Sequence, residues 1–154
     1  MLNILNGTET DPIWQFCADG DLKGLREALE RGEDLSDTDG SYGLSGLMWT
    51  VICSQDDVMD FLLKQPSINV NQQNNTGNTA LHLACCTQDR VTAVSMLVGH
   101  PSISLNTKNS KGATPLMLAT QSGIIDNVKV LMTVRGVDLE TKDGDGRNLE
   151  EVAR

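Results

Sequence analysis

Residues 77–84 of the chain read Gly-Asn-Thr-Ala-Leu-His-Leu-Ala, and residues 112–119, 35 positions later, read Gly-Ala-Thr-Pro-Leu-Met-Leu-Ala. A third, weaker copy contains Leu47-Met48 and is preceded by Gly43. Self-similarity at this period indicates a stack of repeated structural units. In such folds the extended surface of neighbouring units carries binding, and a catalytic pocket is uncommon.

The second half of the unit also recurs. Residues 61–71 read FLLKQPSINVN, residues 96–106 read MLVGHPSISLN, and residues 130–140 are a third version without the proline. Each unit thus has two short apolar-periodic segments joined by polar residues, followed by a connector rich in Asn, Asp, Gly and Ser, which predicts a helix–turn–helix pair and a turn. Because helices this short are unstable alone, the units must bury their apolar faces on one another.

Local signals predict where the helices begin. Thr79 and Thr114 stand at helix N-cap positions, and Pro115 occupies the first helical position, where its missing N–H costs nothing. Gly77 and Gly112 mark connector turns, in which a positive φ is easy only for glycine.

These motifs resemble the ankyrin-repeat family, whose unit reads Asp-x-x-Gly-x-Thr-Pro-Leu-His-x-Ala, then a second helix, then Gly-Ala-Asp-Val-Asn. The resemblance implies an all-α ankyrin-repeat solenoid of helix–turn–helix units with short β-hairpin-like connectors. It makes residues 1–154 one domain, with repeats at about 11–38, 39–73, 74–108 and 109–142 and a half-repeat cap at 143–154.

Two departures from the family pattern lead to local expectations. Gly46 and Trp49 stand where the family has proline and a smaller apolar residue, so we expect a less regular start of that helix. The unit at 74–108 has one extra residue between its helices, near residues 88–90, which predicts a longer turn without a change of fold.

Composition narrows the classes of function. The formal charge of −9 and the pI near 4.5 disfavour nucleic-acid binding, which concentrates Lys and Arg on one face. No stretch of 18 apolar residues is present, and residues 1–5 lack the basic region and long apolar run of a signal peptide. We therefore expect an intracellular protein, cytoplasmic or nuclear, that contacts no membrane.

The residues offer little support for catalysis. The four cysteines, Cys17, Cys53, Cys85 and Cys86, contain no Cys-x-x-Cys pair and are expected to be small buried residues in a reducing compartment. A thiol–imidazole pair of Cys86 with His82 is a weak alternative, because the family's histidine usually bonds loop backbone between repeats. With no phosphate-binding glycine loop and no paired carboxylates in phase, we expect no cofactor, no metal and no enzymatic activity.

Charge differs between the middle and the ends of the chain. Residues 65–125 contain one acid, Asp89, and three bases, whereas the remaining residues contain 20 acids and nine bases. Charged ends keep the outer faces of a repeat stack soluble, which is sufficient to explain the acidity there. The hypothesis for the middle is that it is uncharged because it contacts a partner.

The resemblance also implies which positions bind a partner, since ankyrin modules use the finger tips and the concave face of their first helices. The finger positions are Ser41, Tyr42 and Leu44, then Asn75, Thr76 and Asn78, then Ser110, Lys111 and Ala113, and the helix positions are Ile52, Cys86 and Gln121. Tyr42 is the only tyrosine, and aromatic residues carry much interface energy, although folding onto the first finger is an equal alternative.

One asparagine is a candidate for modification. Asn71 and Asn106 occupy the family's Val-Asn position, where they are expected to hydrogen-bond the connector. In related modules this asparagine can be hydroxylated by a dioxygenase that favours a leucine eight residues earlier. Asn71 has Leu63 there and Asn106 has Val98, so Asn71 is the better candidate.

The sequence thus predicts a non-catalytic, monomeric protein-binding module of the scaffold or adaptor type, whose partner is another protein. The first alternative is a structural fragment of a longer multi-repeat protein, which would expose apolar surface at its C-terminal end and self-associate. Glu150 and Glu151 favour the complete module, because they suit the first turn of a final helix. The second alternative, an enzyme or cofactor binder, has no support in the residues.

Overall fold

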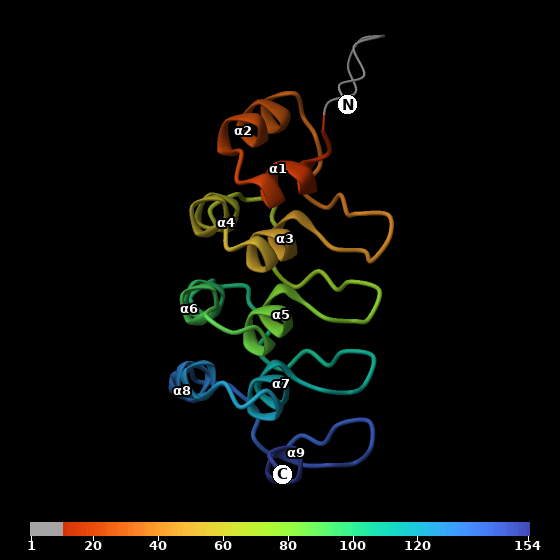
Figure 1. Cartoon of the computed structure of the whole chain (residues 1–154), viewed down its shortest axis with the longest axis vertical. Coiled ribbons are helices and arrows are strands. Elements are labelled where there is room, and N and C mark those ends of the chain that lie inside the picture. Colours follow the sequence, from red (N-terminus) through yellow and green to blue (C-terminus); the bar gives the residue numbers. More distant parts are fainter. Residues whose placement is uncertain (1–10) are drawn as a thin grey trace.

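The computed structural model describes residues 11–154, so the first ten residues of the predicted domain lie outside it. Within the described part, the helices form two columns (Figure 1). The inner column contains α1 (Ile13–Asp19), α3 (Gly46–Cys53), α5 (Ala80–Cys86), α7 (Pro115–Gln121) and α9 (Leu149–Val152). The outer column contains α2 (Leu22–Glu30), α4 (Asp56–Leu63), α6 (Val91–Val98) and α8 (Ile125–Thr133). The predicted all-α repeat stack is therefore confirmed.

Hairpin-like loops project from the inner column on the side opposite the outer helices (Figure 1). We call them fingers and number them in chain order as residues 39–44, 74–78, 109–113 and 143–147. In residues 11–154 the only β-bridge outside named strands joins Thr38 to Ser45, at the base of the first finger. The connectors are thus loops held by turn hydrogen bonds, with little regular strand pairing.

Among the inner helices of residues 11–154, α3, α5, α7 and α9 begin with a side-chain cap, whereas α1 begins after Pro12 without one. Thr79 and Thr114 accept hydrogen bonds from the backbone N–H groups of the third helical residues, and Pro115 is the first residue of α7. The expectation of an irregular start at Gly46 is wrong, because Ser45 caps α3 through the same bond to the Met48 N–H. A hydroxyl at the N-cap, and not the proline after it, satisfies the free N–H groups.

Gly46 itself has a packing role. A Cβ placed on it would lie 2.7 Å from the Sγ atom of Cys17 in α1, so only glycine allows the two inner helices to approach this closely. The longer turn predicted in the third unit is confirmed: four residues separate α5 from α6, against two between α3 and α4. Asp89 adopts a positive φ of 56° within this turn.

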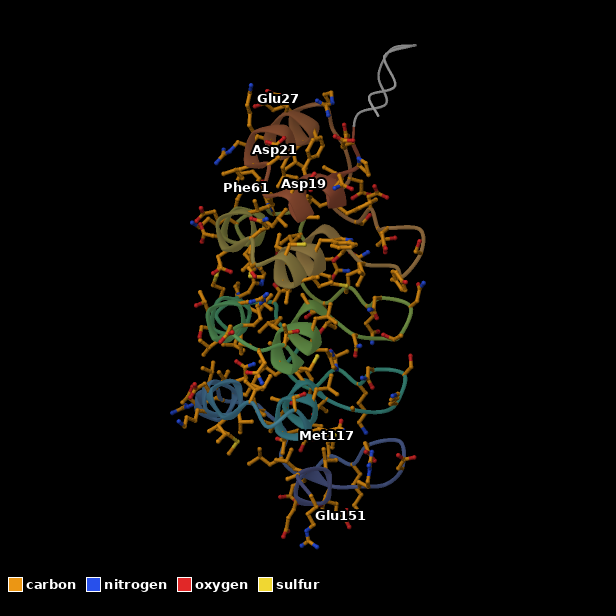
Figure 2. The ribbon with its side chains drawn as sticks, viewed as in Figure 1. Asp19, Asp21, Glu27, Phe61, Met117 and Glu151 are labelled. Carbon is orange, nitrogen blue, oxygen red and sulfur yellow. The ribbon has the colours of Figure 1, made fainter. Side chains whose placement is uncertain are left out.

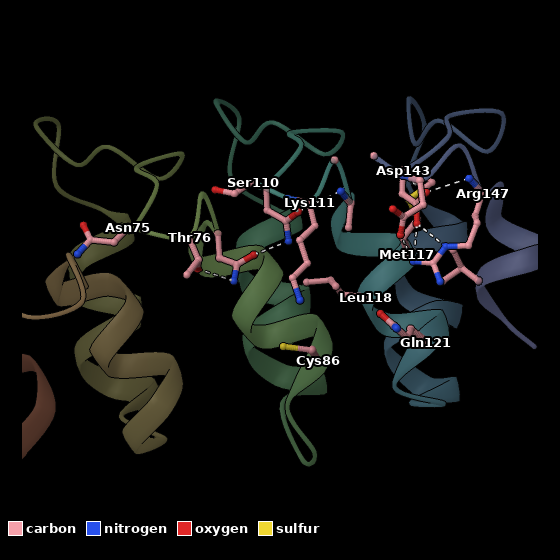
Figure 3. Close-up of a pocket in the computed structure, with 17 residues that line it drawn as sticks. Asn75, Thr76, Cys86, Ser110, Lys111, Met117, Leu118, Gln121, Asp143 and Arg147 are labelled. Carbon is pink, nitrogen blue, oxygen red and sulfur yellow. Dashed lines mark hydrogen bonds and ion pairs between the residues drawn. The ribbon is translucent and has the colours of Figure 1, made fainter.

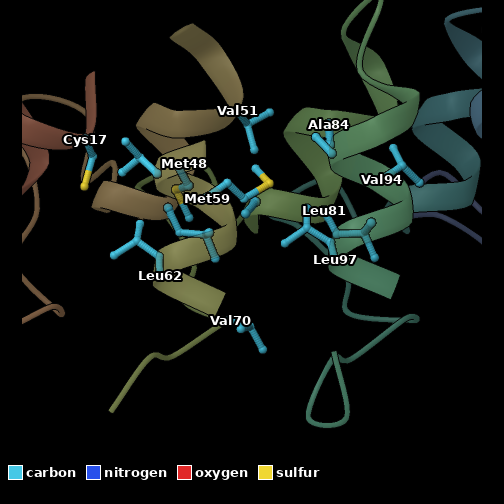
Figure 4. Packing of buried hydrophobic residues seen from close by; sticks show 14 of the residues in the cluster. Cys17, Met48, Val51, Met59, Leu62, Val70, Leu81, Ala84, Val94 and Leu97 are labelled. Carbon is cyan, nitrogen blue, oxygen red and sulfur yellow. The ribbon is translucent and has the colours of Figure 1, made fainter. Parts of the chain in front are cut away.

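The core follows the stack as one continuous column (Figure 4). The inner helices α3, α5 and α7 contribute the buried leucines Leu47, Leu81 and Leu116. The outer helices α4 and α6 contribute Leu62 and Leu97. Met48 of α3 and Met59 of α4 are fully buried within this column. Since every unit buries its side chains against its neighbours, we expect no single unit to be stable alone.

Polar side chains reinforce each junction in the same place. Near the start of an outer helix, a side chain donates to carbonyls at the end of the preceding unit's inner helix. Gln55 Nε2 donates to the Ala18 carbonyl at 3.1 Å, and Arg90 Nε donates to the Val51 carbonyl at 2.7 Å. Asn127 Nδ2 reaches the carbonyls of Ala84 and Cys85 at 3.1 and 3.2 Å. Three different residue types thus satisfy helix-end carbonyls that have no intrahelical partner.

Charged side chains gather toward the two ends of the stack. Figure 2 shows Asp19, Asp21 and Glu27 around the first two helices and Glu151 at the last one. None of the helices in residues 11–154 is long and apolar enough to cross a membrane.

Candidate functional site

The fingers share one construction, shown most simply by the second. The Asn74 Oδ1 atom accepts hydrogen bonds from the N–H groups of Thr76 and Asn78 at 3.0 and 2.9 Å, and the Asn74 N–H donates to the Asn78 carbonyl at 2.9 Å. Gly77 has a φ of 74°, in the left-handed region. The corresponding capping residues of the other fingers are Asp39, Asn109 and Asp143. Each finger is therefore closed by its own first side chain.

Neighbouring fingers are also bonded to each other. One main-chain hydrogen bond per junction joins Asn75 to Tyr42, Ser110 to Thr76, and Gly144 to Lys111, with N···O distances of 3.0, 3.0 and 2.8 Å. On the first three fingers the carbonyl that accepts this bond belongs to the residue directly before the glycine of positive φ, and Asp145 occupies the same position on the fourth. The four tip residues are Tyr42, Thr76, Lys111 and Asp145. The row of finger tips thus presents four different groups in order: a phenol, a hydroxyl, an ammonium and a carboxylate.

A groove of about 960 Å³ lies between the last three fingers and the inner helices α5, α7 and α9 (Figure 3). Eight of the twelve residues proposed from the sequence line it: Asn75, Thr76, Asn78, Cys86, Ser110, Lys111, Ala113 and Gln121. Residues that the sequence reasoning missed complete it: Asn109, Gly112, Met117, Leu118, Asp143, Gly144, Asp145, Arg147 and Val152. The groove therefore combines polar finger atoms with an apolar floor.

The remaining four predicted residues do not line this groove: Ser41, Tyr42, Leu44 and Ile52. Tyr42 is 68% exposed and does not line the groove, so it stands free at the tip of the first finger. Leu44 is only 8% exposed, and its backbone N–H donates to the Asp39 carboxylate at 2.6 Å. The placement of Leu44 on an exposed tip is therefore wrong, because this apolar side chain turns into the core at the base of the finger.

Charges in the groove are mostly paired. The Arg147 guanidinium lies 2.8 Å from the Asp143 carboxylate and 3.3 Å from that of Asp145. The backbone N–H of Arg147 and its side chain lower the pKa of Asp143. Within the described residues no ion pair or hydrogen bond of the Lys111 ammonium is found, and this side chain is exposed. Lys111 thus offers an uncompensated positive charge near the centre of the groove.

His82 supports the groove from beneath. Its Nδ1 atom accepts from the Thr79 N–H at 3.1 Å, and its Nε2 atom lies 3.1 Å from the carbonyl of Ala113 in the third finger. The side chain is buried, and this burial lowers the pKa of His82 below its ordinary value. The neutral ring therefore ties α5 to the next finger, and the prediction that it bonds loop backbone between repeats is confirmed.

The cysteines do not form a reactive centre with it. Both His82 ring nitrogens are occupied by Thr79 and Ala113, so neither is available to a thiol. Burial raises the pKa of Cys17 to about 12 and also raises that of Cys85, so both thiols stay protonated. Cys86, expected among the buried cysteines, is exposed, and desolvation raises its pKa as well. No group of metal-binding side chains is found in residues 11–154.

Asn71 and Asn106 each bridge two units. Asn71 Nδ2 donates to the Ser102 carbonyl at 2.7 Å, and Asn71 Oδ1 accepts from the Ser104 N–H at 2.8 Å. Asn106 makes the equivalent bonds to Gly136 and Asp138 in the next unit. The expected role in the connector is confirmed and extends across the junction, while hydroxylation of Asn71 stays a prediction.

Comparison with known proteins agrees with this geometry. A family model described as ankyrin repeats (3 copies) matches residues 66–143, just over half of the chain. A search among curated proteins finds no matching sequence. The matched residues contain the second and third fingers and helices α5, α6, α7 and α8. On the strength of this match and of the observed stack, the chain belongs to the ankyrin-repeat family.

Proposed function

We propose that the chain is a non-catalytic adaptor whose protein partner lies in the groove of the last three fingers. Ankyrin repeats are generally protein–protein interaction modules. The observation that supports the proposal most is the groove itself, in which eight residues chosen as partner contacts from the sequence lie on one surface. A concave surface with an apolar floor and a few convergent polar groups is the usual form of a binding site.

The architecture of the fingers supports recognition of a polypeptide. Their backbone bonds are already made within each finger and to its neighbour, so binding needs little ordering of the loops. The tip side chains differ in chemistry from unit to unit, which suits a partner that extends along the stack. We propose that the module acts as a monomer in the cytoplasm or nucleus, where its free cysteines are compatible with a reducing environment.

The test compares variants that change only exposed side chains. Lys111→Glu with Gln121→Ala alters the centre and the floor edge of the groove, while Lys129→Glu makes the same charge change on the outer helix α8. Equal thermal unfolding of the three proteins is established first. Affinity capture from cell lysate, with quantitative mass spectrometry, then compares their partners.

A partner bound by the unchanged chain and by Lys129→Glu, but lost from the groove variant, supports the proposal. Truncation of a central interface residue typically weakens binding about tenfold or more. Equal capture by all three proteins would move the partner to another face and would contradict the groove as its site.

A further inference from the structure

The charged side chains of the groove of the fingers are unevenly paired. Four of them line it: Lys111, Asp143, Asp145 and Arg147. Both aspartates belong to the fourth finger and pair with Arg147 of the same finger, at 2.8 and 3.3 Å. The Lys111 ammonium has no ion pair or hydrogen bond among residues 11–154. The unpaired charge of the groove is therefore a single cation on the third finger, the middle one of the three.

Oxygen atoms of the second and third fingers already accept hydrogen bonds within the protein. The carbonyl oxygens of Thr76, Lys111 and Ala113 accept from main-chain N–H groups. The Asn109 Oδ1 atom accepts from two N–H groups of its own finger at 3.0 Å, and the Asn78 Oδ1 atom accepts from Asn109 Nδ2 at 2.8 Å. Few oxygen atoms here are thus left for the donors that a ligand would bring.

The side chains left without a partner in this part of the groove can all donate. Within the described residues, the side chains of Ser110, Lys111 and Gln121 make no hydrogen bond, and all three are exposed. An ammonium has three N–H donors and no acceptor, while a hydroxyl and an amide can donate as well as accept. A ligand group that accepts hydrogen bonds and carries a negative charge therefore complements all three side chains.

The surrounding sequence does not oppose such a ligand. Residues 74–121, which form the second and third fingers and helices α5, α6 and α7, contain a single acid, Asp89, and it does not line the groove. The acidic ends of the chain are screened beyond about 8 Å at physiological ionic strength. The middle of the chain is thus specifically poor in acids, which permits a negatively charged partner to approach it.

The apolar floor adds a second requirement. Met117 and Leu118 line the groove from α7, and Figure 3 shows the Lys111 side chain extending from the third finger toward the inner helices. A charge pair that lies against apolar surface is stronger than one in open water. One free cation also matches the single charge of a carboxylate, whereas phosphate groups are usually held by clusters of arginines.

The geometry points to an extended segment of the partner protein that places an Asp or Glu side chain on Lys111 and apolar neighbours on the floor. The groove passes three fingers and Lys111 stands on the middle one, so the carboxylate belongs to a side chain within the segment and not to a chain terminus. Charge complementarity then supplies specificity, and apolar burial supplies affinity. This inference rests on the proposed function and specifies which partners the groove selects.

The test uses a display library of random segments of about 12 residues, held between flexible linkers so that no terminus is offered. The full chain selects from it, in parallel with three variants of equal thermal stability. Lys111→Glu reverses the charge of the groove, and Gln121→Trp places a bulky neutral side chain at its floor edge. Lys129→Glu makes the same charge change on the outer helix α8 and serves as the control. The affinities of the selected segments, made as capped peptides, are then measured by calorimetry.

Segments selected by the unchanged chain and by Lys129→Glu are expected to share an Asp or Glu with apolar residues within two positions of it. Their affinity should fall at least about tenfold with Lys111→Glu and with Gln121→Trp. Replacement of the segment's acid by its amide should cost a similar factor, and Lys111→Glu should itself select Lys or Arg in place of the acid.

The other outcomes separate this inference from the proposed function. Segments that are lost with Gln121→Trp but carry no acid, or that bind Lys111→Glu equally well, would overturn the inference and leave the groove as the binding site. Tighter binding when phosphoserine replaces the acid would identify a phosphorylated partner and would overturn it too. Equal binding by all four proteins would contradict the groove as the site, and selection of no segment at all would overturn the inference.

Discussion

Substitution of His82 by alanine tests whether the hydrogen bonds of this buried ring stabilise the stack. His82 is fully buried, and its ring joins the cap of α5 to the third finger. Removal of the ring breaks the bond to the Ala113 carbonyl and leaves the Thr79 N–H buried without its acceptor, at about 1 kcal/mol for each bond. The lost ring volume adds about 1 kcal/mol. We therefore expect the free energy of unfolding to fall by about 3 kcal/mol.

The same residue makes stability depend on pH. Burial lowers the pKa of His82 in the folded chain below the ordinary value of 6.5, so the unfolded chain binds the proton more readily. Stability from this group is fully present above pH 6.5, and it is lost as the pH falls from 6.5 toward the lower folded pKa. The slope is at most about 1.4 kcal/mol per pH unit. The lowered pKa values of Asp34, Asp138 and Asp143 act only at more acidic pH, near and below 3.8.

Urea unfolding followed by circular dichroism, repeated between pH 7.5 and about 5, measures both effects. The chain has two histidines, so His100→Gln serves as the matched control and should keep the slope of the unchanged chain. His82→Ala should be less stable at pH 7.5 and should show a flatter dependence on pH. An equal slope in His82→Ala and the unchanged chain would refute the assignment of the acid sensitivity to this buried ring.

Three further outcomes follow from the junctions between units. Gly112→Ala should lower the free energy of unfolding at least about 2 kcal/mol more than Gly32→Ala in thermal melts, because both have positive φ but only at position 112 would a Cβ meet backbone, at 2.5 Å. Arg90→Met should cost about 1 to 2 kcal/mol in the same assay through loss of its bond to the Val51 carbonyl. In chain produced in metazoan cells, peptide mass spectrometry should find one added oxygen atom on Asn71, and unmodified peptide alone would contradict hydroxylation.

The sequence predicts the fold well because its signals are local and repeated. A capping threonine, a glycine of positive φ and a buried leucine each act within a few residues, so Thr79 and Thr114 alone locate two helix starts. Ser45 carries the same cap signal, but the glycine that follows it conceals the start of α3. The reason for that glycine is tertiary, since it makes room for Cys17 of another unit, and no local pattern contains this information.

The candidate site is predicted less completely, for two physical reasons. The position of Leu44 in the repeat predicts a residue on an exposed finger tip. Its apolar side chain instead favours burial at the finger base, where Ala113 is also half-buried. Arg147 and Asp143 are absent from the predicted binding residues, because residues 143–154 are predicted only as a half-repeat cap. Their spacing repeats that of Ala113 and Asn109, so the signal for a fourth finger was present in the sequence.

Different residues of a finger hold its structure and present its tip side chain. The tip can therefore change, and with it the partner, without loss of stability. The bonds that close a finger and join it to the next come from backbone groups and from the first side chain, such as Asn109. The tip side chain of Lys111 takes no part in them, so its replacement leaves the finger intact. Affinity for a given partner can therefore vary through the tips, whereas changes at Asn109 or Gly112 alter the spacing of all the tips together. Substitutions at these two kinds of position should separate binding from folding in the same assay.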